Sequence, residues 1–225
     1  MAHITAFFSP LTPLKTSLGI ANDTQCVSDF GGTSAAAPAA TAIFALALEA
    51  RPELTWRDMQ YLCVETGRPF KRDGVYWHKL ASGREYSDQL GYGALDAYAF
   101  VTKAKEWKLV TPQVWITPPY VQFQNGTMEA GRFFNGGERL SKKGVFHAVE
   151  ITEAMAQEHN FGAIEHVQIK VWVQHERRGD IEVTIQSPKK VVSKVGKTRM
   201  YDESPEGLPG WTFTSLRHWY VSFSL

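Results

Sequence analysis

The chain has 225 residues, of which 44% are hydrophobic and 21% are charged, and its formal net charge is +1. This composition is that of an ordinary globular protein and excludes a chain that is disordered throughout. The near-neutral charge gives no bulk attraction to nucleic acid, so we expect no nucleic-acid partner. The N-terminus lacks the pattern of a signal peptide, and we predict no transmembrane segment.

Four residues are candidates for modification or thiol chemistry. Asn22 and Asn125 each begin an Asn-x-Thr triplet, which makes both candidate glycosylation sites. Two cysteines are too few for a disulfide framework. Cys26 lies in a polar loop and is a candidate disulfide half, whereas Cys63 lies in an apolar helical pattern that predicts an inert buried thiol.

The motif FGGTSAAAPA occupies residues 30–39 and opens a long apolar run. The run predicts a helix that begins near Ser34 and ends near Pro52, because proline cannot continue a helix. A helix that is apolar on every side is typical of the middle of a domain. We therefore expect this helix to be buried.

Ser34 stands at the start of this predicted helix. Free backbone N–H groups and the positive end of the helix dipole would stabilise an oxyanion there. Gly31 and Gly32 allow a tight turn. These features suit a nucleophilic serine beside a groove above a layered sheet. They also suit a plain N-cap role for Thr33 or Ser34, so both interpretations stay open.

Two more helices are predicted in the first half. Thr55 and Asp58 form a capping-box pattern, which predicts a helix N-terminus. The apolar face predicted for that helix consists of Trp56, Met59, Leu62 and Cys63. Residues 67–85 predict a polar loop with a short hairpin, and residues 95–107 predict a helix. Residues 111–137 are rich in proline and glycine and predict a loop-rich junction.

Beyond the junction the hydrophobic period changes to two, which is typical of β-strands. Residues 167–173 alternate in this way, and so do residues 181–185 after a turn at 176–179. We predict that the two runs pair as a β-hairpin and that residues 145–151 form a further strand. The second half is therefore predicted to be a β-sandwich. Four aromatic residues are predicted to lie in its core or to pack against the first half of the chain, with a sugar-binding face as the alternative: Trp172, Trp211, Phe213 and Trp219.

The segment GGTSAAAP resembles the nucleophile motif of subtilisin-like serine proteases, in particular the kexin and furin group of proprotein convertases. Four other segments resemble the same group: FALALEARPELTWRDMQYLCVETGRP, YSDQLGYGALDAYAFVTKAKEWKLVTPQ, IEHVQIKVWVQHERRGDIEVTIQSP and YDESPEGLPGWTFTSLRHW. The resemblance covers residues 19–219. It implies an incomplete α/β domain with a parallel sheet over residues 1–111, of which 1–18 are atypical. It implies an all-β jelly-roll sandwich, the P domain, over residues 112–225, with a truncated C-terminal end.

The resemblance also implies roles for individual residues. Ser34 is the acyl-forming nucleophile, and Thr33 and Gly32 belong to the oxyanion site and its neighbouring loop. Cys26 matches a half-cystine. The family order is aspartate, histidine, serine, and no residue before Ser34 fits the first two roles, so we expect this chain alone to be inactive. Calcium is expected in the complete enzyme, with most ligands outside this chain and no metal site within it.

For the complete enzyme the resemblance implies a serine endopeptidase that processes proproteins after paired Lys or Arg residues. It implies the late secretory pathway (Golgi), with or without a membrane anchor, and a P domain that packs on the catalytic domain. A truncated gene model and a natural pseudoenzyme would each explain the missing residues. The alternative from another class is a non-enzymatic β-sandwich module that acts in binding or interaction.

Overall fold

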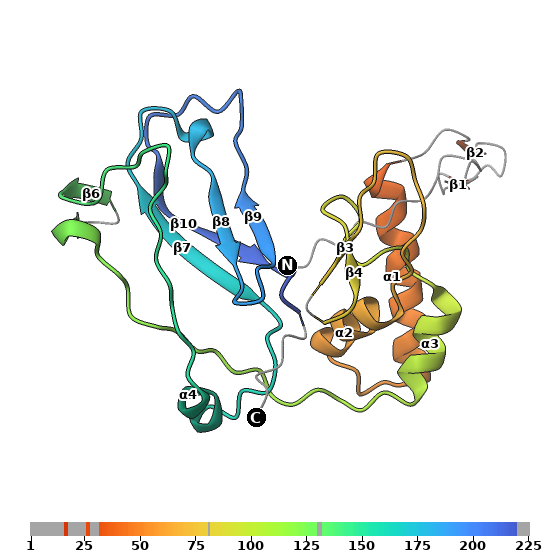
Figure 1. Cartoon of the computed structure of the whole chain (residues 1–225). Coiled ribbons are helices and arrows are strands. Elements are labelled where there is room, and N and C mark those ends of the chain that lie inside the picture. The colour runs from red at the N-terminus through yellow and green to blue at the C-terminus, as the bar shows by residue number, and fades with distance from the viewer. Residues whose placement is uncertain (1–15, 18–25, 28–31, 81, 130–131, 220–225) are drawn as a thin grey trace. The chain divides into compact units, whose positions relative to one another are not determined.

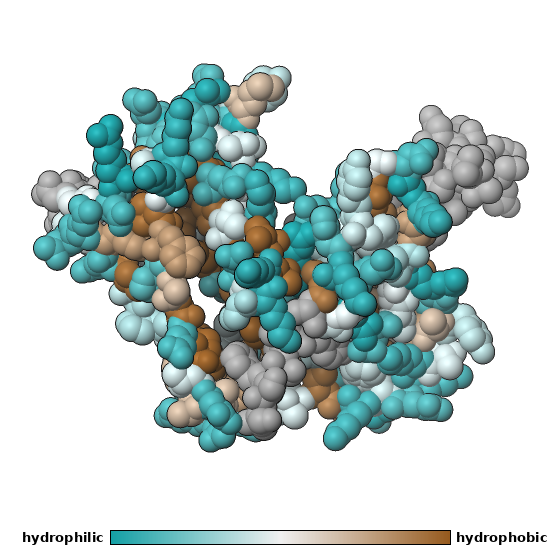
Figure 2. All heavy atoms as spheres, viewed as in Figure 1, coloured by the Kyte–Doolittle hydropathy of each residue, from teal (hydrophilic) through white to brown (hydrophobic). Residues whose placement is uncertain are grey.

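The computed structural model describes residues 16–17, 26–27, 32–80, 82–129 and 132–219 (Figure 1). Contacts within the chain separate two units, Met1–Pro112 and Gln113–Leu225. Hydrophobic residues reach the surface of both units (Figure 2). Neither unit therefore hides all of its apolar side chains.

The described residues of the first unit form three helices and two short ladders. The helices are α1 (Thr33–Ala50), α2 (Trp56–Thr66) and α3 (Ala97–Lys105). The antiparallel ladders pair β1 (Thr16–Ser17) with β2 (Cys26–Val27) and β3 (His78–Lys79) with β4 (Glu85–Tyr86). The hairpin of β3 and β4 confirms the one predicted within the polar loop.

Side-chain caps begin α2 and α3. The predicted capping box is confirmed, because the Thr55 hydroxyl accepts from the N–H of Asp58 and the Asp58 carboxylate accepts from the N–H of Thr55. Asp96 caps α3 by accepting from the N–H of Ala99 at 2.9 Å. These local bonds explain why the helix starts follow so closely from the sequence.

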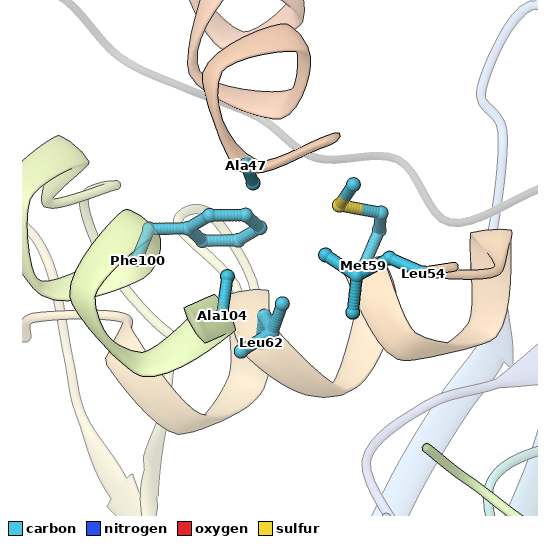
Figure 3. Packing of buried hydrophobic residues seen from close by; sticks show 6 residues of the cluster. All are labelled: Ala47, Leu54, Met59, Leu62, Phe100 and Ala104. Atoms are coloured by element: carbon cyan, nitrogen blue, oxygen red, sulfur yellow. The ribbon is translucent and has the colours of Figure 1, made fainter. Parts of the chain in front are cut away.

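The three helices share one hydrophobic cluster (Figure 3). Its buried members are Ala47, Leu54, Met59, Leu62, Phe100 and Ala104. Phe44 packs on Phe100 with ring centroids 5.5 Å apart. Cys63 also packs against the cluster. The prediction that Trp56 shares this face is wrong, because Trp56 is 59% exposed and is not a member of the cluster.

The expectation that α1 is buried on every side is wrong for the described residues. Only Ala36, Ala40 and Ala47 of this helix are buried, whereas Leu46 is 50% exposed and Leu48 is 41% exposed. The cluster shared with α2 and α3 covers one face of α1. The ladders of the described residues are all antiparallel, so a parallel sheet that could cover the other faces is not among them.

By length and composition, α1 also meets the criterion for a membrane-spanning helix, since it has 18 residues and a mean hydropathy of 1.3. The prediction of no transmembrane segment assumed that no apolar run reaches this length, and α1 does reach it. Core helices of soluble proteins meet the same criterion. Ala47 of α1 lies in the core cluster with Leu62 and Phe100, as a residue of such a helix does.

We expect an isolated segment of residues 20–110 to show no cooperative thermal transition. The exposed apolar side chains of α1 lack partners there, and burial of one leucine contributes about 1.5–3 kcal/mol. The whole margin of a domain is only about 5–15 kcal/mol, so several such losses suffice to unfold it. Circular dichroism and calorimetry measure this. A cooperative transition with equal calorimetric and van't Hoff enthalpies would refute the expectation.

The second unit is built mainly of strands. They are β5 (Thr127–Glu129), β6 (Arg132–Asn135), β7 (Val167–Val173), β8 (Val183–Gln186), β9 (Val192–Gly196) and β10 (Leu208–Ser215). A 3-10 helix, η1 (Phe123–Asn125), precedes β5, and α4 (Glu153–Glu158) precedes β7. The antiparallel pairs are β5 with β6, β7 with β10 and β8 with β9.

One core joins the ladders of β7–β10 and β8–β9, as a β-sandwich requires. Its buried members are Ile181, Val183 and Leu208, and side chains from β7, β9 and β10 pack around them. The core role is confirmed for Trp211 and Phe213, which join this packing, and for Trp219, which is 2% exposed. Trp172 is half-buried, and Tyr120 meets it edge to face with ring centroids 5.1 Å apart.

The predicted hairpin between residues 167–173 and 181–185 is wrong, because β7 pairs with β10 and β8 pairs with β9. The turn between β7 and β8 is a 3-10 helix, η2 (Arg178–Asp180). Its Gly179 N–H donates to the Asp202 carbonyl at 2.9 Å. This bond ties the turn to the chain after β9, so β8 continues in a different ladder from β7.

The strand predicted at residues 145–151 is also wrong. These residues have no regular structure, and Phe146 and Val149 are 81% and 55% exposed. Alternation alone does not make a strand, because backbone groups need a partner to pair with. None of the described strands pairs with this segment.

Candidate active site

Ser34 lies in the first turn of α1 and is exposed. The N-cap residue is Gly32, whose φ of 79° is a conformation that favours glycine. The Gly32 carbonyl accepts from the N–H groups of Ala35 and Ala36 at 3.2 and 3.3 Å, and no side chain caps the helix. The hydroxyls of Thr33 and Ser34 therefore do not serve as its N-cap.

The start of α1 offers an oxyanion site. Among the described residues, the N–H groups of Thr33 and Ser34 have no hydrogen-bond acceptor. Both groups lie at the positive end of an 18-residue helix, where negative charge is stabilised. Pro38 has no N–H to donate to the Ser34 carbonyl, so the first turn is held by fewer bonds than an ordinary helix start.

Among the described residues, no general base is seen beside Ser34. In the part of the chain that the structure describes, no side chain hydrogen-bonds to the Ser34 hydroxyl. The pocket that α1 forms with α3 lies at the other end of the helix and is lined by Leu46, Glu49, Ala50, Ala97, Tyr98, Val101 and Lys105. Leu46 is about 18 Å along the helix from Ser34, at 1.5 Å per residue. The groove and layered sheet expected at the serine are thus not among the described residues.

The buried carboxylate of Asp58 fixes the helices that hold α1 in place. Its side chain is fully buried and accepts four hydrogen bonds. Oδ2 accepts from the N–H and hydroxyl of Thr55 at 2.8 and 2.6 Å, and Oδ1 accepts from Trp107 Nε1 and the N–H of Val110 at 2.9 and 2.8 Å. Burial raises the pKa of Asp58, but these bonds outweigh it and the net pKa is lowered. The capping pattern predicted the Thr55 bond alone.

A charged cluster in the second unit holds the RGD sequence of η2. Arg178 donates two hydrogen bonds to the Asp202 carboxylate at 2.8 and 2.9 Å, and Arg199 donates a third at 3.0 Å. Both guanidinium groups lie over the Trp211 ring, 4.7 and 5.5 Å from its centroid. Gly179 is buried against the backbone of Arg199 and Asp202. The tripeptide Arg178-Gly179-Asp180 therefore has a structural role, as the turn that these contacts hold in place.

We expect the second unit to lose stability between about pH 4 and pH 2 through Asp202. Hydrogen bonds from Arg178 lower the pKa of this carboxyl from 3.8 to about 2. Between these two pH values the unfolded chain therefore binds more protons than the folded chain, so the free energy of unfolding decreases as the pH falls. Urea unfolding of Asp202→Asn should show less pH dependence there. Asp180→Asn removes only a 3.8 Å contact to Arg177 and serves as the control, and equal slopes for the two variants would contradict the assignment.

The other candidate residues have separate surroundings. Asn125 is exposed at the end of η1, where a glycan could be attached. Asn22 lies outside the described residues, and so does the side chain of Cys26. Burial raises the pKa of Cys63 to about 12, which supports the prediction of an inert thiol. Groups of three or more His, Cys, Asp or Glu side chains that could hold a metal ion are absent from the described residues.

Two sequence families match the chain. The subtilase family matches residues 14–93, and the proprotein convertase P-domain matches residues 164–224. These ranges extend beyond the 19–219 similarity at both ends. The first match contains Ser34, Thr33, Gly32 and Cys26.

Curated relatives align with most of the chain. The dibasic-processing endoprotease of Schizosaccharomyces pombe is 36% identical over 86% of this chain and 27% of the relative. Kexin of Saccharomyces cerevisiae is 37% identical over 87% of this chain and 23% of its own length. Mouse furin is 32% identical over 87% of this chain and 23% of its own length. The chain thus spans about a quarter of the length of these relatives.

Solved structures share the fold. A serine protease of Aeromonas sobria superposes with a TM-score of 0.58 at 18% identity, over 87% of this chain and 36% of that one. The same kind of protease in complex with its chaperone gives a TM-score of 0.59 at 17% identity, with the same coverage. At this identity the likeness concerns the fold, an α/β protease part followed by a β-sandwich.

Proposed function

Because the chain belongs to the kexin- and furin-like proprotein convertases of the subtilase family, we propose that Ser34 is the nucleophile of an endopeptidase that cuts proproteins after paired basic residues. The observation that carries the proposal is the place of Ser34 within the subtilase match, at an uncapped helix N-terminus. The name of the Schizosaccharomyces pombe relative supports dibasic specificity.

In this proposal the residues of α1 supply the nucleophile and part of its electrostatic support. The Ser34 oxygen adds to the scissile carbonyl carbon, and the N–H of Ser34 donates to the resulting oxyanion. Thr33 and Gly32 shape the adjacent loop. The serine proton passes to a histidine oriented by an aspartate, both from outside residues 1–225, so the chain alone is inactive.

The proposal extends to the setting of the complete enzyme. A disulfide of Cys26 belongs to it, as do glycans on Asn22 and Asn125. Action in the late secretory pathway, with or without a membrane anchor, also belongs to it. So does calcium dependence, although the described residues by themselves gather no set of ligands for calcium.

A fluorophosphonate probe tests the nucleophile, because it reacts with activated serines. The completed enzyme for this test is a chimera in which residues 19–219 replace the matching region of Saccharomyces cerevisiae kexin. We expect the probe to label Ser34 in the completed enzyme and to leave the isolated chain unlabelled. A folded completed enzyme that stays unlabelled would favour a non-enzymatic module or a pseudoenzyme.

A further inference from the structure

The sequence itself contains four adjacent pairs of basic residues: Lys71-Arg72, Lys142-Lys143, Arg177-Arg178 and Lys189-Lys190. The last three lie in the second unit. If paired basic residues direct cleavage, the fold decides which pair a protease can use. Proteases cut exposed chain that opens easily, and they leave bonds alone when neighbouring backbone covers them.

The pair Arg177-Arg178 is covered. Arg178 is held by Asp202, and Arg177 donates to the Met200 carbonyl at 2.6 Å. The backbone on both sides of the bond after Arg178 is also engaged, because Arg178 N–H donates to the Ser204 carbonyl and Gly179 N–H donates to the Asp202 carbonyl, each at 2.9 Å. Opening this site would break the charged cluster over Trp211.

The pair Lys189-Lys190 is exposed but folded back in the tight turn between β8 and β9. Lys190 has a φ of 60°, which is far from the extended form of a bound substrate. Its N–H donates to the Ser187 carbonyl at 2.8 Å, and Ser187 N–H donates to the Val191 carbonyl at 3.0 Å. Cleavage here would require the end of the β8–β9 ladder to open.

The pair Lys142-Lys143 lies in a segment with few restraints. Residues 138–151 have no regular structure and are exposed almost throughout. Lys142 and Lys143 lie in a turn that the Gly144 N–H closes by donating to the Ser141 carbonyl at 2.9 Å, with Gly144 at a φ of 73°. The Lys143 N–H also donates to the Ser141 hydroxyl at 3.2 Å, but no strand ladder holds this turn among the described residues. Among the described residues, neither lysine ammonium group has an acidic partner. Both side chains are therefore available to an acidic binding pocket.

We propose that the Lys143–Gly144 peptide bond is a cleavage site for paired-basic endopeptidases, including a second copy of the complete enzyme; the latter part rests on the proposed function. The protease serine adds to the Lys143 carbonyl carbon, the C–N bond breaks, and the Gly144 nitrogen takes a proton and leaves as a new N-terminus. Water then hydrolyses the ester and leaves a carboxylate on Lys143. The cut separates β5 and β6 from the sandwich strands β7–β10.

The test uses the full 225-residue chain as substrate for the Schizosaccharomyces pombe dibasic-processing endoprotease, followed by intact mass measurement. Within the second unit we expect cleavage after Lys143, seen as fragment 144–225, at least about tenfold faster than cleavage after Arg178 or Lys190, since those sites need more bonds to open. Cleavage after the exposed pair Lys71-Arg72 of the first unit does not change this ratio. The variant Lys142→Gln/Lys143→Gln should lose this cut. The matched control Lys189→Gln/Lys190→Gln should keep it.

Cleavage after Arg178 or Lys190 ahead of Lys143, or continued cutting of the Lys142→Gln/Lys143→Gln chain, overturns the proposal. A second arm replaces the relative with the completed enzyme and adds a peptide of residues 138–148. If the completed enzyme cuts the peptide but not the chain, the inference fails and the proposed function stands. If it cuts neither while the relative cuts both, the proposed function fails and the cleavage site stands.

Discussion

Replacement of Ser34 with alanine in the completed enzyme should lower kcat by about 10⁶-fold, the scale that loss of the serine has in subtilisin. The hydroxyl is the atom that forms the acyl-enzyme, so the helix N-terminus cannot compensate for its loss. Rates on a fluorogenic peptide with a Lys-Arg pair measure this. KM should change little, because Ser34 contributes little to ground-state binding in this proposal.

Thr41→Ala is the matched control for Ser34→Ala. Thr41 is an exposed hydroxyl residue of the same helix, and its side chain donates only to the Ala37 carbonyl at 2.9 Å. Loss of this hydroxyl should leave kcat within about twofold of the unsubstituted value. A substitution at an exposed position changes the free energy of unfolding by less than about 0.5 kcal/mol, so the enzyme stays folded. If Ser34→Ala retains the rate of Thr41→Ala, the nucleophile assignment is wrong.

Asp58→Ala should destabilise the completed enzyme by roughly 2–6 kcal/mol, the cost of leaving two buried donors without an acceptor. The change removes the carboxylate half of the capping box and so the acceptor of the Thr55 N–H, whereas the backbone N–H of residue 58 still donates to the Thr55 hydroxyl. It also leaves the Trp107 Nε1–H and the Val110 N–H buried without an acceptor, and each such donor costs about 1–3 kcal/mol. Denaturant unfolding at neutral pH measures the loss.

Two variants check the role of Asp58. Asp58→Asn should recover little stability, because its NH₂ group would face N–H donors where the carboxylate has an acceptor. Asp73→Ala changes an exposed aspartate in the loop before β3 and should alter the free energy of unfolding by less than about 0.5 kcal/mol. Equal effects of Asp58→Ala and Asp73→Ala would show that the four hydrogen bonds contribute nothing measurable.

The sequence correctly predicted where the helices lie, but it did not predict how far their side chains are buried. Helix starts depend on neighbours within a few residues, such as Thr55 with Asp58, so a local pattern contains the whole cause. The burial of α1 depends on what packs against it. Leu46 and Leu48 are exposed because α1 has only one covered face among the described residues.

Strand pairing shows the same limit in the second unit. The alternating pattern located β7 correctly, but it assigned β8 as its partner. The partner is β10, about forty residues further along the chain, and alternation contains no information on which strand lies next to which. The contacts of Gly179 and Arg178 with Asp202, which redirect the chain, arise only in the folded unit.

The amino-acid order by itself determined the family, the helix that begins near Ser34 and the capping box. It also determined the change from helical motifs in the first half to strand motifs in the second, because each of these features depends on short stretches of chain. Only the tertiary structure decided that Asp58 binds Trp107 and Val110, that Arg178 is locked by Asp202 while Lys142 and Lys143 stay accessible, and that β7 pairs with β10. These features join residues far apart in the sequence, and such contacts form only when burial and hydrogen bonding across the whole unit outweigh the entropy of bringing them together.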